Sequence, residues 1–290
     1  MNKAKGSIFL LIAALIWGTA FVAQSVGLSN IGNFTFNAIR NYIGALTLLP
    51  VIFIMSKAKK EEKSVAKYGN KTLIIGGIAC GCALAIASSF QQMGIAAGAE
   101  PGKAGFITAL YIIFVPLVGL FTKKKPRATI WLAVLLAVIG MYLLCVKENF
   151  TLEMADVYLL CGAFSFTFHI LTVDKFSPLV DCVKLSCIQF FVCGTLCMIC
   201  MFLFEEPTLA TIKLAAVPIL YTGIMSSGVA YTLQVVGQKS TPPTLATLIM
   251  SLESVFAALA GWIILHQAMS LQELIGSALV FAGIIIAQVF

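Results

Sequence analysis

Ten apolar segments, each about twenty residues long, follow one another along nearly the whole of this 290-residue chain. Only short polar loops, or breaks that contain glycine or proline, separate them. A helix needs about 20 apolar residues to cross the ~30 Å hydrocarbon core of a bilayer. The segments are, within a few residues, Ser7–Ser25, Thr35–Ser56, Thr72–Met93, Lys103–Thr122, Ala128–Val146, Asp156–Asp174, Asp181–Phe204, Lys213–Gly237, Thr244–Leu265 and Ser270–Phe290. This feature predicts an all-α integral membrane protein with ten transmembrane helices.

The composition excludes most other classes of protein. Apolar residues make up 60% of the chain and charged residues 11%, whereas a soluble domain is nearer half apolar and a quarter charged. This balance rules out a soluble globular protein, a disordered chain and a secreted disulfide scaffold. Of the nine cysteines, eight fall inside apolar segments, where we expect small packing residues rather than disulfides or metal ligands.

The positive charges are distributed so that they orient the chain. If the amino terminus is cytoplasmic, fifteen of the nineteen lysines and arginines fall in loops on that side, and the outer loops hold only Lys103, Lys147 and Lys213. Cytoplasmic loops are enriched in Lys and Arg, so we expect both termini to be cytoplasmic. The same pattern predicts a multi-pass protein of the cytoplasmic membrane. The net charge of +7 then needs no nucleic-acid partner.

An internal repeat appears when the chain is compared with itself at a shift of 142 residues. The identical pairs, without a gap, are Gly81/Gly223, Gln92/Gln234, Pro101/Pro243, Ala104/Ala246, Ile107/Ile249, Leu110/Leu252, Phe114/Phe256, Leu117/Leu259 and Gly119/Gly261. The match predicts two five-helix repeats, residues 7–146 and 156–290. Because five is odd, the second repeat is expected to have inverted topology, which is the usual basis of alternating access around a midplane site.

Several short motifs resemble those of a known family. They are Ala13–Gly18 (AALIWG), Arg40, Gly105–Tyr111 (GFITALY) with Pro116, Ser251–Leu259 (SLESVFAAL), Gly276 and Ala282–Gly283. Together with the 5+5 repeat, they resemble the EamA family of the drug/metabolite transporter superfamily over nearly the whole chain. In that family the acid of the ninth span is typically followed by proline, and here Ser254 stands in that place. The resemblance implies a ten-helix transporter fold and does not name a substrate.

Glu253 is the acid that lies deepest in an apolar segment, about ten residues or ~15 Å past Pro243. An ionisable group in hydrocarbon costs about 3 kcal/mol on insertion scales, so its presence calls for an explanation. We expect Glu253 either to contact substrate and carry a proton, or to be a structural carboxyl bonded to a hydroxyl such as that of Ser251 or Tyr231. Its repeat mate is Tyr111, which is expected to line the same cavity or to pack beside it.

Other polar and aromatic residues complete the candidate cavity. Trp17 lies at mid-depth, where it forms a cavity wall or packs tightly. Arg40 either extends outward to water or turns inward to pair with an anionic group or the carboxyl end of a helix. Ser88 lies in a polar cluster near the end of its segment. The predicted cavity set is Trp17, Arg40, Ser88, Tyr111, Tyr231, Ser251 and Glu253.

Three further residues are candidates for gating or proton transfer. Gln92 and Gln234 are repeat mates near opposite membrane surfaces, where they form gate or hinge contacts or are ordinary polar residues at helix ends. His169 packs between helices, or it joins Glu253 in a proton relay.

Motifs for other chemistry are missing from the sequence. Gly102-Lys103 lacks the rest of a Walker A motif, HExxH does not occur, and the chain has two histidines. We therefore expect no cofactor, no metal and no enzymatic activity.

The sequence thus predicts a secondary transporter that moves a small metabolite or drug, such as an amino acid or an amine, by alternating access. Export is expected from the resemblance, and proton coupling through Glu253 is a hypothesis. The alternatives are an uncoupled uniporter, an integral-membrane enzyme that modifies lipids, and a receptor or scaffold that transports nothing. The substrate, the coupling ion, the direction and the oligomeric state stay open.

Overall fold

A computed structural model describes residues 3–58, 69–121, 127–145, 153–265 and 270–289, and within these ranges every regular element is a helix. In chain order the elements are α1 (Lys3–Leu28), α2 (Asn33–Ala58), α3 (Asn70–Ala96), α4 (Pro101–Thr108), α5 (Tyr111–Phe121), α6 (Ala128–Cys145), α7 (Met154–Phe176), α8 (Cys182–Phe204), α9 (Leu209–Leu214), α10 (Ala216–Tyr221), the π-helix η1 (Thr222–Tyr231), α11 (Thr232–Gln238), α12 (Pro243–Met250), α13 (Leu252–Leu265) and α14 (Leu271–Val289).

The helices have the length and composition of membrane spans. Within the described ranges, eight helical stretches are long and apolar enough to cross a bilayer, and the shorter apolar helices Ala128–Leu143 and Leu271–Ala287 accompany them. The outer surface carries large apolar side chains such as Phe53, Ile54 and Phe202, which are 59%, 66% and 73% exposed. Such a surface belongs in lipid, because a soluble monomer rarely exposes large apolar patches. The chain is therefore a multi-span membrane protein.

Several predicted boundaries fall outside the described residues. These are the span ends at Thr122, Val146 and Phe290, and most of the lysines of the loops at 59–68 and 122–126.

Two predicted spans, which were expected to be single helices, are each broken near the middle. The fourth is divided into α4 and α5, and the ninth into α12 and α13. At the first break, backbone hydrogen bonds join residues three positions apart instead of four. Leu110 N donates to Ile107 O at 3.2 Å, and Ile112 N donates to Ala109 O at 3.0 Å. At the second break, Ser251 Oγ donates to Leu248 O at 2.8 Å. This break forms although Ser254 stands where proline is typical of the family.

The eighth predicted span also differs from a single regular helix. Instead of one helix over Lys213–Gly237, the chain forms α9, α10, η1 and α11 in succession. Pro218, inside α10, has no N–H to donate to the preceding turn. The π-helix η1 follows directly, and π-helical turns often occur at functional sites.

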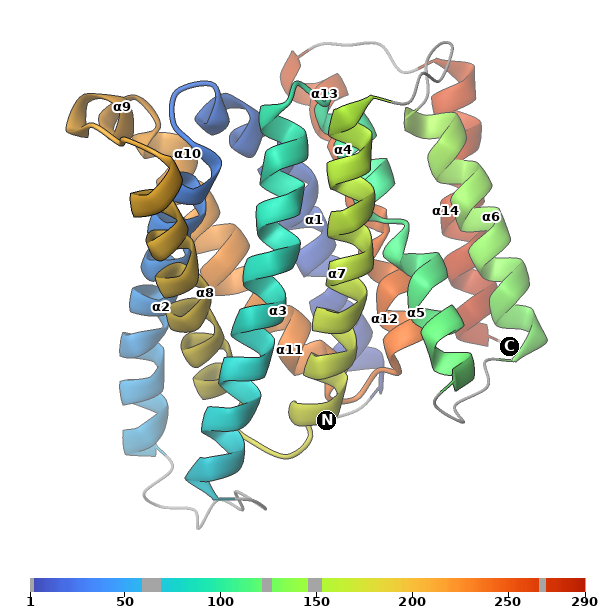
Figure 1. The fold of residues 1–290 in the computed structure, drawn as a ribbon. Helices are drawn as coiled ribbons and strands as arrows, with labels where there is room; N and C mark the ends of the chain where they lie inside the picture. Colours follow the sequence, from blue (N-terminus) through green and yellow to red (C-terminus); the bar gives the residue numbers. More distant parts are fainter. Residues whose placement is uncertain (1–2, 59–68, 122–126, 146–152, 266–269, 290) are drawn as a thin grey trace.

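The helices pack side by side in one bundle (Figure 1). α2 packs on α8, α3 packs on α7 and α8, and α6 packs on α14, while α1 contacts α13, η1 and α11 in the interior. α2 and α8 run antiparallel, since the beginning of α2 at Thr35 bonds the residue that follows α8, Glu205. α6 and α14 do the same, with Gln272 Nε2 donating to Leu143 O at 3.1 Å. The amino-terminal and carboxyl-terminal ends of the chain lie at the same end of the bundle (Figure 1).

Candidate functional site

A narrow cavity, with about 40 Å³ of space accessible to a water-sized sphere, lies in the middle of the bundle. The lining side chains come from ten different helical elements: Trp17, Phe21 and Gln24 (α1), Arg40 (α2), Gln91 (α3), Thr108 (α4), Tyr111 (α5), Phe166 and Ile170 (α7), Ser226 and Tyr231 (η1), Gln234 (α11), Met250 (α12) and Glu253 (α13). Polar groups thus gather at the centre of an apolar protein.

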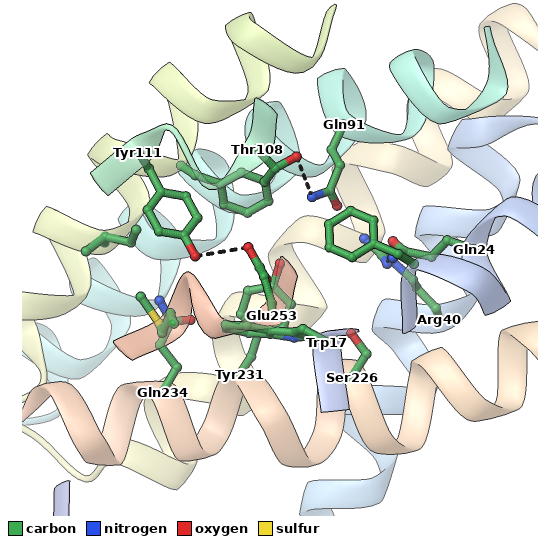
Figure 2. A pocket seen from close by; sticks show the side chains of 14 residues that line it. Trp17, Gln24, Arg40, Gln91, Thr108, Tyr111, Ser226, Tyr231, Gln234 and Glu253 are labelled. Carbon is green, nitrogen blue, oxygen red and sulfur yellow. Dashed lines mark hydrogen bonds between the residues drawn. The ribbon is translucent and has the colours of Figure 1, made fainter. Parts of the chain in front are cut away.

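The two broken helices place a tyrosine and a carboxyl group against each other. Tyr111 is the first residue of α5 and Glu253 the second residue of α13, directly after the breaks. Tyr111 Oη donates to Glu253 Oε1 at 3.0 Å (Figure 2). Both side chains are buried, each 4% exposed. The two residues are 142 positions apart, which is the shift of the internal repeat, so repeat mates contact each other in the cavity.

Arg40 forms the cationic end of the cavity. Its Nη1 donates to Gln24 Oε1 at 2.7 Å, and Gln92 Nε2 donates to the same oxygen. The guanidinium also lies over the ring of Phe36, 5.7 Å from its centroid. Arg40 is 2% exposed, and its Nε has no hydrogen-bond partner. Arg40 therefore turns inward, which is one of the two orientations expected from the sequence.

Aromatic rings and amide groups form the walls. Trp17 and Tyr231 meet edge to face with their centroids 4.8 Å apart, and Trp17 Nε1 is buried without a partner. Gln91 Nε2 donates to Thr108 Oγ1 at 3.3 Å. The cavity thus offers apolar surface together with a few fixed polar groups, which is the usual make-up of a small-molecule site.

Of the predicted candidates, six line the cavity and four do not. The six that line it are Trp17, Arg40, Tyr111, Tyr231, Gln234 and Glu253. Ser88 and Ser251, expected to line it, instead direct their hydroxyls to carbonyls of their own helices, those of Ala85 and Leu248. The Ser88 hydroxyl also lies 3.9 Å from Cys193 Sγ on α8, and serines on helices commonly bond their own preceding turn.

His169 lies behind the cavity wall. Its Nε2 is 3.1 Å from Gln189 Oε1, and its ring is 5.9 Å from that of Tyr231, centroid to centroid. Tyr231 lines the cavity and His169 does not. A proton relay from His169 to Glu253 would therefore need an intermediary.

The two glutamines expected near opposite membrane surfaces are both buried inside the protein. Gln92 is 0% exposed and Gln234 is 2% exposed. Both helices continue beyond them, α3 to Ala96 and α11 to Gln238. Gln92 supports the Gln24–Arg40 contact, and Gln234 lines the cavity. Each glutamine thus lies about one helical turn from the end of its helix, with its side chain inside the protein.

Sequence reasoning did not select eight of the lining residues for the cavity. They are Phe21, Gln24, Gln91, Thr108, Phe166, Ile170, Ser226 and Met250. A signal existed for two of them, because Trp17, Phe21 and Gln24 have the four-residue and three-residue spacing of a single helix face. The other six depend on how each helix is rotated about its axis, which an evenly apolar segment does not reveal.

No metal site accompanies this cavity in the part of the chain that the structure describes. Groups of three or more His, Cys, Asp and Glu side chains spaced to hold a metal ion are not found there.

The chain is similar to known membrane proteins over nearly its full length. The EamA-like transporter family model matches residues 4–146 and again residues 153–288. An uncharacterized transporter of Archaeoglobus fulgidus is 27% identical over 99% of this chain and 87% of its own length. Two uncharacterized transporters of Bacillus subtilis, YoaV and YwfM, are 22% and 25% identical, over 95% and 97% of this chain and 94% and 92% of theirs.

The fold has a counterpart among solved structures. One crystal structure superimposes with a TM-score of 0.79, covers 99% of this chain and 97% of its own, and shares 18% sequence identity. At this identity the similarity concerns the fold alone.

Proposed function

The chain belongs to the EamA-like transporter family, and from this premise we propose that it is a secondary transporter that moves a small solute across the cell membrane by alternating access. The observation that carries the proposal is the contact between Tyr111 and Glu253 inside the cavity. Discontinuous helices that present polar groups near the midplane are typical of substrate sites in secondary transporters. A buried membrane carboxyl that lines a cavity is by default a functional group.

The proposed architecture has ten spans in two inverted repeats, residues 7–146 and 156–290. The family matches two successive segments of nearly these bounds, which supports a duplication. The mates α2 and α8 pack together, and Cys187 Sγ approaches the carbonyl of its mate Ala45 at 3.7 Å. Mates that run antiparallel, as α2 and α8 do, are what inverted topology requires.

A glycine at the same repeat position in each half supports the same duplication. Gly81 on α3 lies so close to α8 that an added Cβ would be 2.6 Å from Val192 Cβ. Its mate Gly223 on η1 lies equally close to α2, where a Cβ would be 2.7 Å from Ile43 Cγ2. Both halves thus use a glycine at the same place to let a neighbouring helix approach.

The proposed orientation places both termini in the cytoplasm. It is supported by the lysine-rich loops on that side and by the position of the two ends at one end of the bundle (Figure 1). Transport from the cytoplasm outward is the proposed direction, as the family resemblance implies.

Glu253 is the proposed point of proton coupling. Its carboxylate accepts the Tyr111 hydroxyl, and within the described residues it is the carboxyl group that lines the cavity. A substrate that needs this carboxylate competes with a proton for it, and such competition couples the two fluxes in opposite directions. An uncoupled uniporter would use the same cavity without this competition.

The test is transport in proteoliposomes with a labelled panel of amino acids, nucleosides and amines, with and without an imposed pH gradient. We expect one class to accumulate only when the gradient is present. In Glu253→Gln that accumulation falls to simple equilibration, while the matched control Glu206→Gln, at an exposed carboxyl, behaves as wild type. Equilibration without accumulation by wild type would instead establish a uniporter. Unchanged gradient dependence in Glu253→Gln would refute the coupling role.

A further inference from the structure

Arg40 is a buried cation for which the structure shows no anion. It lines the cavity and is 2% exposed. Within the described residues, no carboxylate forms an ion pair with it: its side-chain hydrogen bond is to the neutral amide of Gln24. An unpaired charge inside a membrane protein is costly, and such groups usually pair or mark a substrate pathway.

The ionisable groups that face Arg40 are the hydroxyl of Tyr231 and the thiols of Cys193 and Cys197, which are uncharged in their ordinary neutral-pH forms. The Gln24 oxygen already accepts hydrogen bonds from Arg40 and from Gln92, and the Gln24 amide donates to Ala20 O at 3.2 Å. Arg40 Nε stays without a partner. A guanidinium has five N–H donors in a planar fork that suits a carboxylate, so most of this donor capacity is unused.

A second donor faces the same space. Trp17 lines the cavity and its indole Nε1 is buried without a partner. In Figure 2, Gln24, Arg40 and Ser226 lie toward one end of the cavity, Tyr111 and Gln234 lie toward the other, and Trp17 lies between them. The unpartnered donors of Arg40 and Trp17 thus lie at one end and in the middle of the cavity, and the Tyr111–Glu253 end holds the acid.

The charge balance limits what the Arg40 end can hold. Among the lining residues, Arg40 is the cation and Glu253 the acid. When Glu253 is protonated, one negative charge on the solute neutralises the cavity, and when Glu253 is ionised, a zwitterion leaves it neutral, whereas a phosphate dianion leaves an excess charge in both cases. A singly charged carboxylate matches both the charge and the planar geometry of the guanidinium.

We propose that Arg40 is a substrate anchor and that the transported solute is a small organic acid or zwitterion whose carboxylate binds the Arg40 guanidinium. This inference rests on the proposed transport function and adds a substrate class to it. A solute that also carries an amine directs that group toward Glu253.

The experiment is an equilibrium binding assay on the purified full chain in detergent. The probes are two matched sets that differ in charge: phenylalanine, its amide, phenethylamine and 3-phenylpropionate, and the corresponding leucine set. A ligand that binds the folded state raises the unfolding temperature by an amount that grows with the logarithm of 1 + [L]/Kd, so a series of concentrations yields Kd. We expect at least one acid to bind at least ten times more tightly than its amide. Equal binding of acid and amide, or binding of no acid, overturns the proposal.

A second test uses a variant that keeps Arg40 and changes its neighbour Gln24. Gln24→Glu places a carboxylate beside the guanidinium at nearly constant volume. We expect it to remove the preference for acids over amides without lowering the unfolding temperature of the ligand-free protein. Gln272→Glu, which makes the same change at an exposed residue that does not line the cavity, is expected to retain that preference. Retention of the acid preference by Gln24→Glu contradicts the anchor role and leaves Arg40 structural.

The assay is independent of transport, so the two proposals fail separately. If acids bind as expected but no solute crosses proteoliposomes, transport is refuted and the anchor stands. If amines accumulate and bind as well as acids do, the anchor is refuted and the transporter stands.

Discussion

The two halves of the molecule, residues 3–145 and 153–289, each supply seven of the fourteen side chains that line the cavity, yet they supply different chemistry. The first half contributes the cation Arg40 and the amides of Gln24 and Gln91. The second contributes the acid Glu253 and more of the apolar wall. Where mates at the 142-residue shift both line the cavity, the chemistry differs at every pair: Gln24/Phe166, Thr108/Met250 and Tyr111/Glu253.

This difference shows that the backbone and the side chains determine separate properties of the site. The shared backbone breaks place residue 111 and residue 253 at matching positions, and the side chains at those positions then give the cavity its two unlike ends. A cavity built from two identical halves would have like groups facing like groups. Two carboxylates or two arginines in contact would repel each other, so divergence of the halves is what makes a mixed-charge site possible.

Exchanging the central pair tests whether the two halves are equivalent in geometry, and it has the largest expected effect. Tyr111→Glu alone places two carboxyl groups in contact in a buried site, and we expect it to cost about 3–5 kcal/mol of stability, the range found for uncompensated buried charges. The double exchange Tyr111→Glu with Glu253→Tyr restores one hydrogen-bonded pair and should recover most of that loss. The measurement is unfolding in detergent. Failure of the exchange to recover any stability would show that the halves are not geometrically equivalent here.

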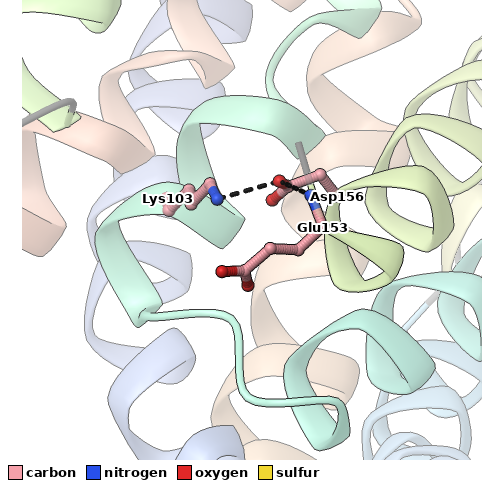
Figure 3. Close-up of polar contacts among 3 residues, drawn as sticks. All are labelled: Lys103, Glu153 and Asp156. Atoms are coloured by element: carbon pink, nitrogen blue, oxygen red, sulfur yellow. Dashed lines mark hydrogen bonds and ion pairs between the residues drawn. The ribbon is translucent and has the colours of Figure 1, made fainter. Parts of the chain in front are cut away.

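A contact between α4 and α7 offers the next comparison. Lys103 Nζ lies 2.8 Å from Asp156 Oδ2, and Asp156 also accepts a hydrogen bond from Glu153 N at 2.9 Å (Figure 3). The ion pair joins the two halves, and the positions that match Lys103 and Asp156 at the 142-residue shift are Leu245 and Ala14, which are both buried and apolar. One place between the halves thus holds an ion pair, whereas the matching positions hold apolar side chains.

Converting this ion pair to its apolar counterpart should be tolerated better than breaking it. Lys103→Leu leaves Asp156, which is 1% exposed, without its cation, and we expect a loss of about 2–3 kcal/mol. Lys103→Leu with Asp156→Ala removes both charges and should lose only about 1 kcal/mol, mainly the cap of α7. If the double variant is as unstable as the single one in detergent unfolding, the ion pair has no apolar equivalent.

The smallest expected effect concerns the caps at the amino-terminal ends of α2 and α8, which are repeat mates. The first turn of α2 is capped by Glu205 from the other half, which accepts from Phe34 N and Thr35 N at 2.8 Å each and from Thr35 Oγ1 at 2.6 Å. α8 is capped by its own Asp181, which accepts from Val183 N at 3.0 Å.

We expect Glu205→Ala to cost about 2 kcal/mol and Asp181→Ala about 1 kcal/mol, because typical caps contribute ~0.5–2 kcal/mol and Glu205 accepts more bonds. Thermal unfolding of the two variants side by side measures the difference. An equal or larger loss for Asp181→Ala would show that the contact between the halves adds nothing beyond an ordinary cap.

Much of this site could be predicted from the sequence, for a physical reason. Apolar segments of membrane length identify the helices, and the 142-residue shift pairs Tyr111 with Glu253 before any coordinates are known. The rotation of each helix could not be predicted, because a segment that is apolar on every face does not show which face meets the cavity. Thr108 and Met250 were missed for this reason, and Ser88 and Ser251 were selected as lining residues although they do not line the cavity.

The break before Glu253 was also hard to predict. Without proline at residue 254, the sequence offered no steric reason for the ninth span to be interrupted. The structure interrupts it at Ser251, whose hydroxyl bonds the carbonyl of Leu248. A side chain that bonds its own backbone can weaken a helix locally, but serines do so in many helices that stay continuous.

The central claim is that one cavity opens alternately to the two sides of the membrane, and accessibility of a single lining residue tests it most directly. Ser226 lines the cavity from η1. In a background with the nine native cysteines replaced, Ser226→Cys is exposed to a membrane-impermeant thiol reagent from one side or the other of oriented vesicles. The account predicts labelling from both sides and protection by the transported solute. Labelling from one side only, under every gradient and solute tested, would contradict alternating access.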